Sequence, residues 1–168
     1  EDGSRTFTRG SGGLVTALVG LAQHVDAMWV ACARTDTDVE WQEGRVALWQ
    51  SPETIQVRFL SPPPAAYDAY YNVIANPLLW FLQHQMWDIP RQPVIDITTW
   101  RAWTEGYVAI NRLYSDAIVE QARTSAKRPL VMLQDYHLYL APRMIRLALR
   151  PAERPTILHF VHIPWPGP

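Results

Sequence analysis

Apolar residues recur at three- and four-residue steps in three segments of the chain. This period is typical of amphipathic helices and predicts helices over residues 14–25, 65–85 and 99–126. The first helix opens directly after Gly12-Gly13. The second contains Pro77, and we expect an interruption there because the proline ring clashes with the preceding turn.

Short apolar runs lie between these helices. Runs at 28–33, 45–49 and 55–60 predict three strands, and the last two are expected to pair as a hairpin. Runs at 129–134 and 156–161 are continuous, which is typical of parallel strands covered on both faces. A helical segment at 139–150 joins them into a β-α-β unit. The predicted fold class is therefore α/β, a Rossmann-like, doubly wound and mostly parallel sheet.

Length and composition limit the classes of protein that fit. With 168 residues, 48% of them hydrophobic, the chain can bury a core, and we expect one domain over 1–168. Fifteen basic and sixteen acidic residues leave a net charge of −1, which argues against a nucleic-acid partner. Cys32 is the single cysteine and cannot form an internal disulfide. No run predicts a membrane span or signal peptide, so we expect a cytoplasmic protein without a membrane partner.

Doubly wound sheets bind ligands beyond the carboxyl ends of their strands. This rule singles out three candidate positions in the sequence. Gly12-Gly13 precedes a helix whose first N–H groups can hold a phosphate, although a glycine pair before a helix is more often a simple turn or cap. Asp135 follows one buried strand and either accepts a substrate proton or caps the next helix. His162 follows the other buried strand, where it is either catalytic or simply packed and hydrogen-bonded.

The sequence contains no group of residues that is arranged to bind a metal ion or a cofactor. His159 and His162 are three apart in a predicted strand, so their side chains should point to opposite faces, and no cysteine or carboxylate clusters with them. Neither a nucleotide-binding glycine fingerprint nor a Gly-x-Ser-x-Gly elbow is present. We therefore expect no metal and no cofactor.

Five segments spread over nearly the whole chain resemble the trehalose-6-phosphate synthase family in order and spacing. They are Arg9-Gly10-Ser11-Gly12-Gly13 with Leu14 to Leu18, Tyr70-Tyr71-Asn72 with Asn76 and Trp80, Trp103 with Tyr107 and Asn111, Gln134-Asp135-Tyr136-His137-Leu138, and His162-Ile163-Pro164-Trp165-Pro166. The resemblance implies the N-terminal, acceptor-side half of a GT-B glycosyltransferase, whose C-terminal nucleotide-sugar domain lies outside this chain. It also implies that the chain alone is inactive.

The resemblance further implies a retaining, metal-independent transfer of glucose from a nucleotide-glucose donor to glucose 6-phosphate, forming trehalose 6-phosphate. Asp135 and His162 would be the catalytic residues. Gly12 and Gly13 would bind the donor diphosphate, whereas Tyr71, Trp80 and Asp135 would bind the acceptor. The donor nucleotide and any homo-oligomer stay open.

One position departs from the family pattern. Where the family commonly has a strand reading Trp-x-Gly-Trp, this chain reads Trp29-Val30-Ala31-Cys32, so a pocket-lining tryptophan is replaced. This leaves room for another phosphorylated acceptor, such as glycerol 3-phosphate or a cyclitol phosphate. A noncatalytic regulatory homologue is the alternative from a different class.

Overall fold

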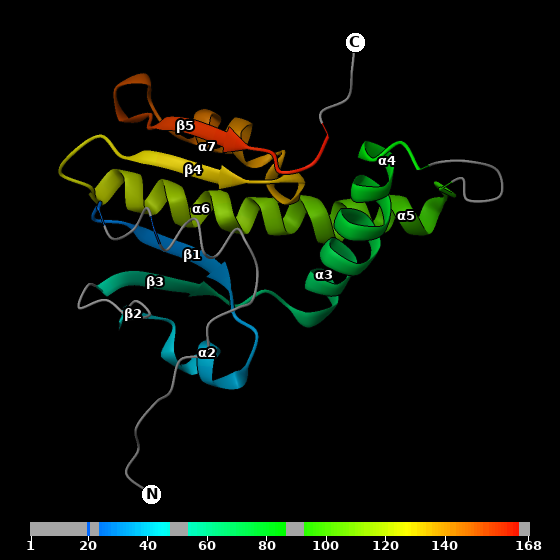
Figure 1. The fold of residues 1–168 in the computed structure, drawn as a ribbon, viewed down its shortest axis with the longest axis horizontal. Coiled ribbons are helices and arrows are strands. Elements are labelled where there is room, and N and C mark those ends of the chain that lie inside the picture. Colours follow the sequence, from blue (N-terminus) through cyan, green and yellow to red (C-terminus); the bar gives the residue numbers. More distant parts are fainter. Residues whose placement is uncertain (1–19, 21–23, 48–53, 87–92, 165–168) are drawn as a thin grey trace, which may run out of the picture. The chain divides into compact units, whose positions relative to one another are not determined.

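The computed structural model describes residues 20, 24–47, 54–86 and 93–164, and Figure 1 shows their fold. The chain divides into two compact units, Glu1–Ser61 and Pro62–Pro168, which are described separately below. The single-domain organisation predicted for residues 1–168 stays a prediction. The predicted helix at 14–25 lies almost wholly outside the described residues.

The first unit contains a three-stranded sheet in the order β1-β3-β2. Its strands are β1 (Met28–Cys32), β2 (Glu43–Ala47) and β3 (Thr54–Leu60). β1 runs parallel to β3, and β2 pairs antiparallel with β3. The three predicted strands and the hairpin pairing are therefore confirmed, with β2 beginning two residues earlier than expected. Ile55 and Val57 form the buried centre of this unit.

A short helix, α2 (Asp36–Trp41), was not predicted from the hydrophobic pattern. Its first turn is closed by a capping box, in which Asp38 N–H donates to Thr35 Oγ1 and Thr35 N–H donates to the Asp38 carboxylate. The helix buries none of its residues fully. Local capping rather than a buried apolar face therefore explains why it forms, and a search for helical periodicity overlooks it.

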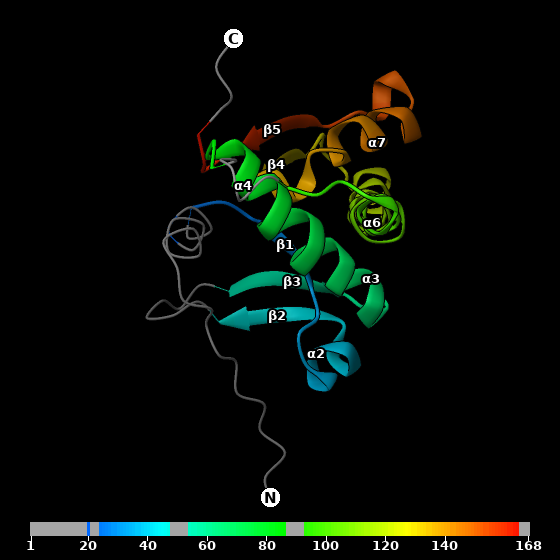
Figure 2. The same cartoon turned by 90° about the vertical axis from the view of Figure 1, so that its right-hand side faces the viewer.

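Two long helical runs open the second unit. The first comprises α3 (Pro64–Asp68), the π-helical segment η1 (Ala69–Trp80) and α4 (Phe81–Gln83), and the second comprises α5 (Ile97–Arg101), the π-helical segment η2 (Ala102–Val108) and α6 (Ala109–Thr124). Figure 2 shows α6 nearly end-on. Both predicted helices are confirmed, but the predicted interruption at Pro77 is wrong because η1 runs through it. In a π-helix the hydrogen bonds span five residues, and the wider turn relieves the clash that proline causes in an α-helix.

The two helical runs lie close together at Gly106. A Cβ atom at this position would lie 2.6 Å from Tyr70 N, 2.7 Å from Ala69 Cβ and 2.8 Å from Ala69 C. All three distances are shorter than real Cβ contacts, and two of the three atoms are backbone atoms. The absence of a side chain at residue 106 therefore lets η1 and η2 pack against each other.

Replacing Gly106 by alanine is expected to destabilise the protein by about 1–3 kcal/mol, the usual cost of overpacking a filled core. The gain in helix propensity, about 1 kcal/mol, offsets part of this cost. The midpoint of urea unfolding of the full-length protein measures the change. Gly20→Ala is the matched control because a Cβ there meets nothing within 4 Å. An equal midpoint for wild type and Gly106→Ala would contradict the close approach.

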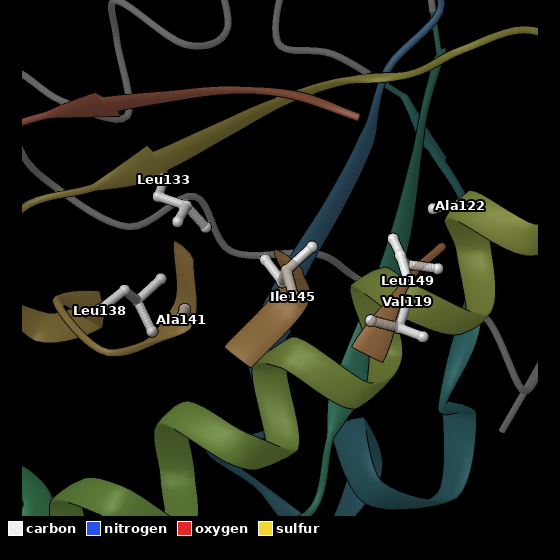
Figure 3. Packing of buried hydrophobic residues seen from close by; sticks show 7 residues of the cluster. All are labelled: Val119, Ala122, Leu133, Leu138, Ala141, Ile145 and Leu149. Carbon is white, nitrogen blue, oxygen red and sulfur yellow. The ribbon is translucent and has the colours of Figure 1, made fainter. Parts of the chain in front are cut away.

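The rest of the second unit is a β-α-β arrangement. β4 (Leu130–Gln134) and β5 (Thr156–Phe160) pair in parallel, and α7 (Ala141–Ala148) lies between them in the sequence. Two 3₁₀ turns, η3 (Tyr136–Leu138) and η4 (Pro151–Glu153), flank α7. The β-α-β prediction is thus confirmed. Figure 3 shows the core of this unit, in which side chains from β4, α6, α7 and their connections meet: Val119, Ala122, Leu133, Leu138, Ala141, Ile145 and Leu149.

The expected coverage of β4 and β5 on both faces is wrong for the described residues. Both strands alternate between more buried and exposed positions. Leu133 belongs to the core cluster of Figure 3, and Val131 and Ile157 are partly buried and pack against that cluster. The opposite face exposes four large apolar side chains: Leu130, Met132, Leu158 and Phe160.

Within the described part of the chain, no helix is both long enough and apolar enough to cross a bilayer.

Candidate functional site

The carboxyl ends of β4 and β5 bring Gln134, Asp135 and His162 together. The parallel pairing continues one residue beyond β4, where Asp135 N–H donates to Phe160 O over 2.7 Å. His162 follows β5 by two residues and reaches the same place. The two residues expected to carry chemistry, Asp135 and His162, therefore meet at the edge of the sheet where ligands bind in this class of fold.

Asp135 has a backbone conformation that is unusual for any residue except glycine. Its φ is 60° and its ψ is −177°. Such a conformation costs on the order of 1–3 kcal/mol and persists where the surrounding structure holds it. Strain of this kind concentrates at functional sites, which favours a role for Asp135 beyond that of a cap.

The Asp135 carboxylate is oriented by two backbone donors. Tyr136 N–H donates to Oδ1 over 3.0 Å, and His162 N–H donates to the same oxygen over 3.3 Å. Among the described residues no donor reaches Oδ2. One carboxylate oxygen therefore fixes the orientation of the side chain, and the other is available to accept a hydrogen bond from a ligand hydroxyl. Asp135 both caps the first N–H of the following turn and keeps a free acceptor.

Each of the two histidines near β5 has a defined hydrogen bond. His162 Nε2 lies 3.0 Å from Gln134 Oε1, so this nitrogen carries a proton and donates it to the amide oxygen. His159 Nε2 likewise donates to Asp135 O over 2.8 Å. His159 thus braces the strained backbone of Asp135, while Gln134 holds the imidazole of His162 across the two strands.

Two buried side chains of the second helical run hold the segment 135–140, called here the Asp135 loop. Asn111 is fully buried; its Nδ2 donates to His137 O over 3.0 Å and to Tyr107 O over 2.9 Å, and its Oδ1 accepts from Leu140 N–H over 3.2 Å. The hydroxyl of Tyr107, whose residue is also fully buried, donates to Tyr136 O and accepts from Tyr139 N–H. Backbone groups of Tyr136, His137, Tyr139 and Leu140 in the Asp135 loop are therefore satisfied by side chains of the second helical run.

The first helical run reaches the same loop through two further contacts. Tyr136 Oη donates to Asn76 Oδ1 over 2.7 Å, and Tyr139 Oη hydrogen-bonds with the side-chain amide of Gln83. The loop is thus tied to both helical runs of its unit.

Burial controls the protonation of the ring side chains around the Asp135 loop. It raises the pKa of Tyr136 to about 12 and raises the pKa values of Tyr107 and Tyr139 as well. Burial also lowers the pKa of His137, against the opposing attraction of the Asp135 carboxylate. At neutral pH these tyrosines keep their protons, and His137 is neutral.

Tyr71 and Trp80 both lie on η1, nine residues apart. Tyr71 is half-buried, and Trp80 is exposed.

Three of the predicted site residues lie at or near the Asp135 loop in the described part of the structure. Asp135 and His162 are in direct contact, and Tyr71 reaches the Asp135 loop through the ring of His137, 5.7 Å from its own. The ring of Trp80 instead lies against that of His84, with ring centroids 4.2 Å apart and an interplanar angle of 33°. Gly12 and Gly13 lie outside the described residues. Where the structure describes the chain, no three His, Cys, Asp or Glu side chains gather in a way that could hold a metal ion.

Several contributors to the site were not singled out from the sequence as site residues: Asn76, Gln83, Tyr107, Asn111, Gln134, His137 and His159. Tyr107 and Asn111 carry a usable signal, since they are four residues apart on the buried stripe of a helix, and a buried asparagine needs partners from another element.

Comparison with known proteins identifies the family of this chain. The sequence model of glycosyltransferase family 20 matches residues 1–168. A trehalose-6-phosphate synthase of Mycolicibacterium gilvum is 34% identical over 170 residues, and one of Mycobacterium ulcerans is 36% identical over 166 residues. Each alignment covers 98% of this chain, which spans 30% of the relative's length. The chain belongs to glycosyltransferase family 20.

Solved structures give the same answer for the fold. A structure named trehalose-6-phosphate synthase OtsA superimposes on 95% of the chain and 31% of its own, with a TM-score of 0.70 at 20% identity. A Burkholderia xenovorans structure, named an alpha,alpha-trehalose-phosphate synthase in complex with glucose-6-phosphate, covers 93% of the chain and 31% of its own, with a TM-score of 0.61 at 22% identity. The predicted class, a Rossmann-like part of a GT-B glycosyltransferase, is therefore confirmed.

Proposed function

We propose that this chain is the acceptor-side part of a retaining glycosyltransferase that moves glucose from a nucleotide-glucose donor to glucose 6-phosphate and forms trehalose 6-phosphate. The observation that carries the proposal is the contact between Asp135 and His162, with Asp135 Oδ2 left open to a ligand. The names of the relatives in the family support it, as does a neighbouring E. coli structure described as bound with UDP-2-fluoro glucose.

The roles of the individual residues follow from this proposal. Asp135 Oδ2 accepts a hydrogen bond from an acceptor hydroxyl, and the imidazole of His162 contacts the donor sugar near its reacting carbon. Tyr71 binds the phosphate end of the acceptor, and Trp80 offers its ring to the face of the sugar, because sugar rings stack well on aromatic faces. Gly12 and Gly13 offer backbone N–H groups to the donor diphosphate.

The chemistry at this site is a displacement at the anomeric carbon of the donor glucose. The bond from that carbon to the diphosphate oxygen breaks, a bond to an acceptor hydroxyl oxygen forms, and the hydroxyl proton leaves with the diphosphate. The groups of this chain orient the acceptor hydroxyl and the donor sugar. The departing diphosphate needs cationic groups that converge on it, and these would come from the nucleotide-sugar domain of the complete protein.

The test is a transfer assay with the full-length protein that contains this chain, using UDP-, GDP- and ADP-glucose with glucose 6-phosphate and detecting trehalose 6-phosphate. We expect turnover with at least one donor, unchanged by EDTA, and none from residues 1–168 alone. Absence of transfer with all donors and acceptors would favour the regulatory homologue. Loss of activity with EDTA, restored by a divalent cation, would contradict the metal-independent mechanism.

Cys32 favours a second candidate, transfer to a different phosphorylated acceptor such as glycerol 3-phosphate or a cyclitol phosphate. The residue is buried at the end of β1, at a position where the family commonly has tryptophan. The same assay with a panel of these acceptors, comparing wild type with Cys32→Trp, separates the two. A shift of preference toward glucose 6-phosphate in the variant would favour the second candidate.

We also propose that the protein acts in the cytoplasm, because its substrates are nucleotide sugars and sugar phosphates.

A further inference from the structure

The ring of Tyr71 lies between two other rings in the second unit. Tyr67, one turn earlier in the same helical run, stacks on it with ring centroids 5.6 Å apart and an interplanar angle of 10°. His137, from the Asp135 loop, stacks on it with centroids 5.7 Å apart at 22°. The contact with His137 joins the helix of Tyr71 to the loop of Asp135, whereas the contact with Tyr67 stays within one helical run.

His137 is itself held firmly. Its carbonyl accepts from the buried Asn111 side chain, and its ring lies 4.2 Å from the ring of Tyr136, at 29°. Tyr70 approaches the same imidazole, with centroids 6.1 Å apart. The His137 ring is therefore packed by tyrosines of η1 and of its own loop.

Hydrogen bonding by the imidazole ring does not explain why His137 is buried at this position. Nε2 is buried and has no hydrogen-bond partner among the described residues. Burial lowers the pKa of the imidazole, and the only carboxylate that opposes this shift is Asp135. A neutral ring with a buried, unsatisfied nitrogen contributes through its flat face rather than through a hydrogen bond within the protein.

We propose that His137 is a positioning residue of the acceptor site, whose ring holds Tyr71 at a fixed distance from the Asp135 loop. The inference rests on the proposed function, in which Tyr71 and Asp135 bind one acceptor molecule. Two groups from different segments bind one small ligand well only when their spacing is set before the ligand arrives. The stack of His137 on Tyr71 sets that spacing.

The test uses the full-length protein and three substitutions of the stacking ring. His137→Phe keeps a flat ring, His137→Leu keeps a large apolar side chain without a ring, and His137→Ala removes both. We expect His137→Leu and His137→Ala to raise the KM for glucose 6-phosphate about three- to tenfold, the range expected for loss of one aromatic pair. The KM for the donor should change less than twofold, and His137→Phe should restore the wild-type KM for the acceptor.

A double-mutant cycle checks that His137 acts through Tyr71. Once Tyr71→Ala has removed the partner ring, His137→Leu should raise the acceptor KM no further. His24→Leu is the control, because His24 is exposed and has no role in the proposed mechanism. Equal effects of His137→Leu with and without Tyr71 would overturn the proposal, as would a failure of His137→Phe to restore the KM.

Failure of the proposed function gives a different pattern. If wild type transfers glucose to no phosphorylated acceptor, the proposed function is wrong, and the position of the Tyr71 ring in crystal structures of wild type and His137→Leu then tests the inference. An unmoved Tyr71 ring in that variant would overturn the positioning role of His137.

Discussion

Replacing Asp135 by asparagine is expected to lower kcat/KM for glucose transfer by about ten- to a hundredfold, because a hydrogen bond to a charged group contributes about 1.5–3 kcal/mol. Asparagine matches aspartate in shape, and its oxygen can keep the bonds from Tyr136 N–H and His162 N–H. Its NH₂ group would replace Oδ2, so a donor would face the acceptor hydroxyl where an acceptor had been. The substitution therefore removes the hydrogen-bond acceptor that faces the ligand but keeps the orientation of the side chain. Steady-state kinetics of the full-length protein measure it.

Asp116→Asn is the matched control, since Asp116 is exposed on α6 and lies outside the site. It should leave kcat/KM within about twofold of wild type, as surface substitutions away from a site usually have small effects. Activity of Asp135→Asn close to that of wild type would show that the carboxylate does not act on the acceptor. Asp135→Gly adds a second readout, because glycine adopts a φ of 60° without strain. Its activity should be lost while its fold is retained.

The secondary structure of the second unit could be predicted where one period dominates the sequence. The continuous apolar runs of β4 and β5 and the helical stripe of α6 correspond to observed elements because burial against a neighbour imposes those periods. The coverage of β4 and β5 could not be predicted from their own residues. A continuous apolar run shows that both faces of a strand tolerate burial, whereas the face that is covered depends on where α6 and α7 pack.

The position of Asp135 and His162 could be predicted because topology alone fixes it. Parallel strands end at the same edge, so the residues that follow them meet. The supports of the Asp135 loop could not be predicted in this way. His137 O and Asn111 are 26 residues apart in the sequence, and Tyr136 Oη and Asn76 are 60 apart, so these contacts arise only after the helices pack.

Pro77 marks a further limit of the sequence pattern. A proline inside a helical segment predicts a break, because its ring clashes with the preceding turn. The observed helical run continues through Pro77, which lies inside η1. The local rule for proline therefore does not decide where this helix ends.

Asn111 connects the stability of the second unit with the geometry of its site. It uses both its amide donors, on Tyr107 O and His137 O, and its oxygen accepts from Leu140 N–H. The residue is fully buried, so water cannot replace a lost partner. A group left unsatisfied in such a place costs about 1–3 kcal/mol. The conformation of the Asp135 loop therefore depends on this one side chain more than on any surface contact.

Asn111→Asp is expected to destabilise the protein by roughly 2–6 kcal/mol at pH 7, because its carboxylate would face two carbonyl oxygens that have each lost a donor. Burial and these carbonyls should raise the pKa of the introduced carboxyl group above its unfolded value of about 3.9. A carboxyl group whose pKa is higher in the folded state than in the unfolded state carries no ionisation penalty below its unfolded pKa. As the pH rises above that pKa, the group increasingly destabilises the folded state. The gap between the urea-unfolding midpoints of the variant and wild type should therefore be small at pH 4 and large at pH 7. Gln121→Glu is the control, because it also replaces an amide by a carboxyl group but at a half-buried position of α6, and its gap to wild type should not widen with pH. A gap for Asn111→Asp that does not grow with pH would contradict the buried hydrogen bonds assigned to Asn111.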